Sequence, residues 1–398
     1  MYKDTKSSSI NVKKIFSGCF YTFFVNGVVA LILGSILPYM RETYQLNYKI
    51  AGLLLSFHSI GNLISSYIAG VLPMYIGRRK SILLFSSFGV IAFLLMIITR
   101  NPIILILAFV LTGLNRGAVS NFNNRMVNEV ATGKGWALNL LHSVFAIGAF
   151  ISPFIALFFT MNNPNGWIYA VIVVSALCLI SFLVYAFIPI IEEKPASKKE
   201  KSVKVKTDWG FLKNKYFLTA CGIAFSYMCA EQAINGWLVT YFKDSGIMSG
   251  GLAQTMASLL WIVILFGRLL YAYLSNHIVK SKLLLAGAFG YFLFFIVLLS
   301  GREITPVVIG IIGIGFFMSG MYPTLIASIG TIVKEYPMAL SVLLTVSGLG
   351  GIIMPLVIGA VADSIGIIGG MSVVIISVVS TFVFIIYNRY IYRNVDEV

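Results

Sequence analysis

Long apolar runs fill nearly the whole chain, and short polar segments separate them. A membrane-spanning α-helix needs about 20 apolar residues, whereas the strands of a membrane barrel alternate in segments of about ten residues. The runs have the helical length. The pattern therefore predicts an all-α membrane protein with twelve transmembrane helices, at residues 15–40, 49–76, 81–99, 102–127, 135–161, 167–191, 215–242, 251–277, 282–300, 305–333, 338–362 and 367–391.

One strongly polar, lysine-rich stretch interrupts this pattern after the sixth predicted span. At a constant offset of 202 residues, Gly113 corresponds to Gly315 and Pro153 corresponds to Pro355. We interpret this correspondence as an internal duplication. The expected organisation is an N-terminal six-helix bundle, a basic cytoplasmic linker and a C-terminal six-helix bundle, at residues 1–191, 192–214 and 215–398 respectively.

The composition agrees with a chain that lies almost wholly in the membrane. Of 398 residues, 59% are hydrophobic and 11% are charged, against about 45–50% and about 25% in soluble domains. Twelve spans leave no room for a catalytic domain or for the soluble output domain of a sensor, and no intramembrane catalytic motif is present. The four cysteines lie inside apolar runs without metal-ligand spacing. We expect no enzyme, no cofactor and no metal.

The net charge of +15 reflects topology rather than nucleic-acid binding. If the N-terminus is cytoplasmic, twenty-one Lys and Arg residues near the span ends lie on the inner side and five lie on the outer side. The positive-inside rule then places both termini in the cytoplasm, with the basic surface facing anionic lipid. We expect a multi-pass protein of the plasma membrane that acts as a monomer and binds no nucleic acid.

Charged side chains deep in the spans mark the candidate site. A charge at the bilayer centre costs at least about 2.5–3.5 kcal/mol and needs a functional or structural reason. Arg116 in the fourth span and Glu231 in the seventh both come close to the midplane. These two residues could form an ion pair between the halves that takes part in transport. In that case, protonation of Glu231 and substrate contact at Arg116 would each compete with the ion pair. Alternatively, it could be a static pair that only makes both charges tolerable.

Other polar residues extend this site along the same helices. Ser120 and Asn123 share the helical face of Arg116, and Tyr227 and Asn235 lie one turn from Glu231. His58 stands in the second span without an accompanying polar stripe, and Arg268 in the eighth span either snorkels to the inner surface or anchors a gate. The candidate substrate-binding residues are Asn26, Arg116, Asn123, Asn124, Asn139, His142, Tyr227, Glu231, Gln232, Asn235 and Trp237.

The loop after the second span carries a family motif. The sequence from Gly70 to Lys80 resembles the signature of the major facilitator superfamily in its Gly and Arg spacing, although Met74 and Tyr75 replace the usual charged pair. The resemblance implies two pseudo-symmetric six-helix bundles around a central cavity, lined by the first and fourth helices of each half. It also implies gating roles, which we assign to Gly70, Gly77, Arg78 and Arg268.

Three segments resemble the fucose, glucose and galactose permease branch of that superfamily: Ala137 to Pro153, Ala230 to Tyr241, and Gly267-Arg268. This resemblance implies symport of a sugar or sugar derivative coupled to a proton or to sodium, with Glu231 and His142 as the proton-coupling residues. An arginine at the midplane suits an anion better than a neutral sugar. The alternative is therefore an organic-anion carrier, or a drug-type exporter or antiporter, that recognises its substrate through Arg116.

Overall fold

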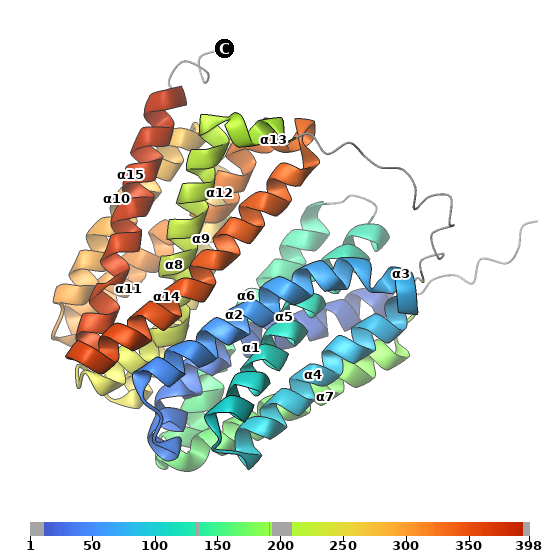
Figure 1. The fold of residues 1–398 in the computed structure, drawn as a ribbon, viewed down its shortest axis with the longest axis vertical. Helices are drawn as coiled ribbons and strands as arrows, with labels where there is room; N and C mark the ends of the chain where they lie inside the picture. The colour runs from blue at the N-terminus through green and yellow to red at the C-terminus, as the bar shows by residue number, and fades with distance from the viewer. Residues whose placement is uncertain (1–11, 132–134, 191, 193–208, 393–398) are drawn as a thin grey trace, which may run out of the picture.

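The computed structural model describes residues 12–131, 135–190, 192 and 209–392, which are almost entirely helical (Figure 1). The first half contains α1 (Val12–Tyr44), α2 (Tyr48–Val71), α3 (Pro73–Ile76), α4 (Arg78–Ile98), α5 (Pro102–Val130), α6 (Gly135–Thr160), the 3-10 helix η1 (Pro164–Gly166) and α7 (Trp167–Phe187). The second half contains the 3-10 helix η3 (Gly210–Lys213), α8 (Lys215–Asp244), α9 (Gly250–Leu274), α10 (Lys280–Ser300), α11 (Ile304–Met318), α12 (Met321–Ser328), α13 (Gly330–Glu335), α14 (Pro337–Ser372) and α15 (Val374–Tyr392).

Length and apolar composition qualify eleven helical stretches of the described chain as membrane spans. The last stretch, Met338–Ile391, has 54 residues, which is about 80 Å of helix against a hydrocarbon core of about 30 Å. Its backbone leaves the helical conformation at Ile365 and Gly366, and Gly366 has a φ of +83° that favours glycine. The stretch is therefore two spans, and the predicted all-α, multi-pass fold is confirmed.

Two predicted spans are broken rather than continuous. The second span divides into α2 and α3 at Leu72, because Pro73 cannot donate to the preceding turn and opens a new helix. The tenth span divides into α11, α12 and α13, with breaks at Ser319–Gly320 and Ile329. Residues 193–208 of the predicted linker lie outside the described residues, and the division into two bundles and a linker stays a prediction.

The two halves meet at one end of the molecule and diverge towards the other (Figure 1). Contacts between them pair α1 with α8, α2 with α14 and α6 with α9. One end of the molecule contains Arg41, Asp244 and Asp363, and we call it the closed end. The opposite end, where α3 and α13 lie, is the open end.

Close helix packing repeats in the two halves at corresponding glycines. A Cβ atom on Gly148 of α6 would lie 2.1 Å from the carbonyl oxygen of Phe24, and one on Gly350 of α14 would lie 2.3 Å from that of Phe225. Only glycine allows so close a backbone approach. The predicted duplication therefore corresponds to equivalent packing of α1 on α6 and of α8 on α14.

Candidate functional site

A cavity of about 300 Å³ lies between the two halves. Side chains from the first, fourth, seventh and tenth spans line it, including Asn26, Arg116, Glu231 and Tyr322, and the remaining lining comes from α2, α6 and α9. The lining residues are Phe23, Asn26, Ala30, Leu31, Asn62, Ser66, Arg116, Ser120, His142, Phe145, Met228, Glu231, Gln232, Asn235, Trp261, Arg268 and Tyr322. Its size falls at the lower end of the range for small-molecule sites.

Three charged side chains converge on this cavity: Arg116, Glu231 and Arg268. The Glu231 carboxylate is shielded from bulk water, and it interacts electrostatically with Arg268 and, more weakly, with Arg116. Among the described residues Arg116 and Glu231 form no direct ion pair, so the pair that the sequence suggested is absent in this conformation. Glu231 and Arg268 lie on α8 and α9 of the second half, whereas Arg116 lies on α5 of the first half.

Several buried polar atoms on the cavity wall have no hydrogen-bond partner among the described residues. They are Asn26 Oδ1, Asn235 Oδ1 and the indole Nε1 of Trp261. An unsatisfied buried polar group costs about 1–3 kcal/mol. The three residues that carry these two acceptors and one donor all line the cavity.

Aromatic and cationic groups pack together along one wall. The Trp261 ring lies 6.1 Å from the Phe145 ring, and the guanidinium carbon of Arg268 lies 6.0 Å from the centroid of the Trp261 ring. The His142 ring packs edge-on against Phe23 at 5.4 Å. Arg268 and His142 are therefore each packed against an aromatic ring of the lining.

The structure brings seven of the predicted residues to the cavity: Asn26, Arg116, His142, Glu231, Gln232, Asn235 and Arg268. Arg268 does not snorkel to the inner surface, because its guanidinium remains over the Trp261 ring inside the cavity. Asn124, Asn139 and Trp237 are not among the lining residues, and Trp237 is fully buried 6.3 Å from the Tyr48 ring near the closed end.

Asn123 and Tyr227 serve packing in this conformation. The buried Asn123 amide donates hydrogen bonds to Thr22 Oγ1 (3.1 Å) and to the Tyr185 hydroxyl (2.8 Å), so it joins α5 to α1 and α7. The Tyr227 hydroxyl donates to the Met318 carbonyl oxygen at 3.1 Å, and its ring stacks on Tyr322. The Tyr227 hydroxyl also interacts with the Glu231 carboxylate, so Tyr227 contacts two lining residues without lining the cavity itself.

Sequence reasoning missed a polar stripe on α2. Asn62 and Ser66 line the cavity, one and two turns beyond His58. His58 is not isolated, since its Nδ1 lies 2.8 Å from Thr112 Oγ1 and the residue borders a small annex of about 20 Å³ shared with Gln232. His58, Asn62 and Ser66 follow one another at four-residue spacing in an otherwise apolar span, and this spacing could have revealed the stripe from the sequence.

The predicted gating motif includes Gly77 and Arg78. Gly77 has a φ of +85°, which favours glycine. The buried Arg78 forms a bidentate pair with Glu129 at 2.6 and 2.9 Å, which links α4 to α5. The Glu192 carboxylate accepts hydrogen bonds from the backbone N–H groups of Arg78 and Arg79. A Cβ atom on Gly70 would meet open space.

The closed end is sealed by contacts between the halves. Arg41 Nη2 lies 2.5 Å from Asp244 Oδ2, and the Tyr48 hydroxyl donates to the same oxygen at 3.1 Å. Lys243 pairs with Glu42. The carboxylate of Asp363 accepts hydrogen bonds from the backbone N–H groups of Tyr48 (2.8 Å) and Lys49 (3.0 Å), so a second-half acid stabilises the N-terminus of α2.

Two pseudo-symmetric six-helix bundles around a polar cavity define a membrane transporter of the alternating-access class. The chain belongs to the Major Facilitator Superfamily, whose family profile matches residues 19–313. It is similar to a glucose/galactose transporter of Brucella abortus (25% identity over 379 residues, 87% of each chain) and to the TsgA homologue of Buchnera aphidicola (20% over 323 residues, 80% of each).

Solved structures of transporters share the fold. A nucleoside transporter, NupG, in a point-mutant form, superposes with a TM-score of 0.79 at 14% identity, covering 95% of this chain and 100% of that one. A D-xylose-proton symporter superposes with a TM-score of 0.75 at 12% identity, covering 95% and 97%. The prediction of a small-solute transporter rather than an enzyme is confirmed.

Proposed function

We propose that this protein imports a sugar or sugar derivative across the plasma membrane by proton-coupled symport. The observation that carries the proposal is Glu231, the one acidic residue among the described lining of the cavity, which faces two arginines. The amides and aromatic rings around it suit hydroxyl groups and the apolar face of a sugar ring. The names of the Brucella relative and of the D-xylose-proton symporter support this substrate class.

Alternating access links the proton to the solute through the charge on Glu231. When ionised, the carboxylate interacts favourably with Arg268 and Arg116. When protonated, the carboxyl group of Glu231 loses this attraction. The two arginines then become available to the solute. Arg116 and the Glu231 carboxylate come from different halves, so rocking of the halves changes their separation, whereas Arg268 belongs to the same half as Glu231.

The sidedness of this conformation follows from the charge distribution. The basic segments predicted to be cytoplasmic lie at the open end, including Arg78 to Lys80 and Lys280 to Lys282. On that assignment the closed end faces outward and the structure is inward-open. Solute and proton would be released from the cavity to the cytoplasm in this state.

The decisive experiment is uptake into proteoliposomes with an imposed pH gradient. A gradient of one unit supplies about 1.4 kcal/mol per proton, which supports about tenfold accumulation at one proton per solute. We expect Glu231→Gln to abolish accumulation while retaining solute counterflow, since the amide keeps hydrogen bonding without a titratable charge.

Glu303→Gln is the matched control, because Glu303 is exposed and lies at the start of α11, outside the cavity. The control should accumulate solute like the unmodified protein. Full accumulation by Glu231→Gln would contradict the coupling role.

A second candidate function is transport of a small organic anion. Two arginines against one carboxylate leave the described lining with an excess of positive charge. A thermal-shift screen of neutral sugars, sugar acids and organic anions separates the candidates. The anion carrier predicts stabilisation by anions only, which is lost in Arg116→Gln and kept in the control Arg125→Gln. Stabilisation by neutral hexoses would favour the sugar symporter.

A further inference from the structure

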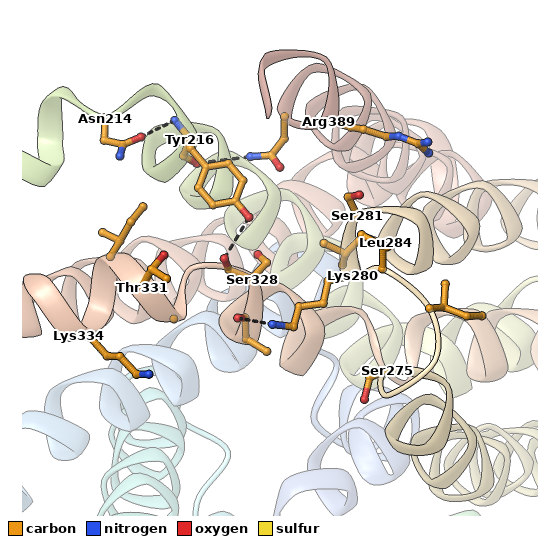
Figure 2. Close-up of a pocket in the computed structure, with 16 residues that line it drawn as sticks. Asn214, Tyr216, Ser275, Lys280, Ser281, Leu284, Ser328, Thr331, Lys334 and Arg389 are labelled. Atoms are coloured by element: carbon orange, nitrogen blue, oxygen red, sulfur yellow. Dashed lines mark hydrogen bonds between the residues drawn. The ribbon is translucent and has the colours of Figure 1, made fainter. Parts of the chain in front are cut away.

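A larger pocket of about 700 Å³ lies at the open end of the second half, apart from the central cavity (Figure 2). It forms where the start of α8, the α9–α10 connection, the α12–α13 segment and the end of α15 come together. It shares no lining residue with the central cavity. Transport as proposed above gives this pocket no role.

The pocket collects positive charge from three separate elements. Lys280 begins α10, Lys334 lies on α13 and Arg389 lies near the end of α15. In Figure 2 Lys280 lies between the other two. None of the described lining residues is acidic. Three like charges around one pocket repel one another, and an anion between them removes that repulsion.

Lys280 is held at the pocket by its own contact. Its Nζ donates to the carbonyl oxygen of Ala327 at 3.3 Å, which uses one of its three donor hydrogens and leaves the rest of the ammonium group for another acceptor. For Lys334 and Arg389 the described part of the chain supplies no carboxylate partner.

Neutral donors complete the lining. The hydroxyl-bearing residues Ser281 and Thr331 border the pocket. The first turn of α10 also faces this region, and its N-cap residue Val279 supplies no side-chain acceptor. The N-terminus of a 21-residue helix favours a negative charge. Lysines, hydroxyls and an uncapped helix start form a donor set suited to phosphate.

We propose that this pocket binds a phosphate-bearing anion and thereby ties α10, α13 and α15 together at the open end. Basic pockets between helices on the cytoplasmic side suit anionic lipid headgroups, and the exposed Ile278 and Val279 give the rim an apolar edge. The same donor set suits a soluble phosphorylated metabolite. α13 ends the broken span whose α12 segment carries Tyr322, so the anion acts on a helix connected to the cavity.

The test compares two triple variants of the full-length purified protein. The pocket variant combines Lys280→Gln, Lys334→Gln and Arg389→Gln. The control variant combines Lys213→Gln, Lys215→Gln and Lys282→Gln, which removes equal charge from exposed residues at the same end but outside the pocket. Apparent Kd is measured for phosphatidylglycerol, with phosphatidylcholine as the neutral lipid, and separately for glycerol 3-phosphate and inorganic phosphate.

We expect the pocket variant to bind about 100-fold more weakly, since each cation contributes about a fivefold factor, and the control variant to bind as the unmodified protein does. Binding of phosphatidylglycerol alone identifies a lipid headgroup as the source, whereas binding of glycerol 3-phosphate identifies a soluble ligand. Binding of neither, or equal weakening in both triple variants, overturns the proposal.

Folding is monitored by the thermal unfolding midpoint of each variant. If the pocket triple variant does not fold, Lys334→Gln alone replaces it, because Lys334 is exposed on α13. This single variant should weaken binding about fivefold, with Lys282→Gln as its control. An unchanged Kd for Lys334→Gln then overturns the proposal.

Discussion

Individual charged residues are tolerated deep in this protein because they face an aqueous cavity rather than lipid. Arg116, Glu231 and Arg268 all do so. The high cost of a charge in the bilayer explains why sequence alone located them. Amides carry a smaller cost and either line a cavity or join helices. The sequence therefore could not separate Asn235, which lines the cavity, from Asn123, which donates to two neighbouring helices.

Asn123→Ala should lower stability and leave solute affinity unchanged. The substitution removes a buried amide and leaves the Tyr185 hydroxyl without this partner, at a cost of about 1–2 kcal/mol. The thermal unfolding midpoint in detergent measures the first effect, and counterflow KM measures the second. Asn124→Ala, at a half-buried neighbour, is the control. A large change in KM with normal stability would restore Asn123 to the binding site.

At the scale of helices, the apolar pattern located the spans well because bilayer thickness constrains their length. It did not reveal the breaks at Leu72 or within the tenth span, since breaks of one or two residues barely change the mean hydropathy. Pro73 marked the first break. In the tenth span, Pro323 lies in the first turn of α12 and cannot donate to the carbonyl oxygen of Ser319, so this proline marked the break at Ser319–Gly320.

Gly113→Ala should destabilise the packing of α5 on α2. A Cβ atom there would lie 2.0 Å from the carbonyl oxygen of His58, so the helices must separate, at a cost of about 1–3 kcal/mol. Gly70→Ala on α2 is the matched control, because its Cβ atom meets open space and alanine favours the helix by about 0.5–1 kcal/mol. Thermal unfolding of both variants measures the difference. Equal midpoints would show that α5 repacks without cost.

For the whole molecule, the two ends differ in how the halves are held. Acidic residues of the second half engage the first half at the closed end, through Asp244 on Arg41 and Asp363 on the start of α2. At the open end, the Arg78–Glu129 pair lies within one half. Among the residues that the structure describes, ion pairs between the halves are found at the closed end. Sequence could not reveal this, because the partners are about 200 or more residues apart.

Asp244→Asn should shift the population towards a state in which the closed end opens. Loss of a charge-assisted contact worth about 1.5–3 kcal/mol changes the conformational equilibrium at least tenfold. Spin labels at Tyr75→Cys and His277→Cys, both exposed at the open end, report the change as a shorter distance between the halves. The native cysteines are buried.

Glu335→Gln, at an exposed residue of the open end, is the control for this shift and should leave the distance distribution unchanged. An identical distribution in Asp244→Asn would mean that other contacts at the closed end determine the conformation.

The bend at Ile365 and Gly366 determines whether the chain crosses the membrane an even or an odd number of times. Without it, the final 54-residue helical stretch would count as one crossing, and the two ends of the polypeptide would lie in different compartments. With it, a fluorescent protein fused after Val398 and one fused before Met1 should report the same compartment. A single glycine with a left-handed backbone thus decides where any C-terminal tag, partner or protease encounters this transporter.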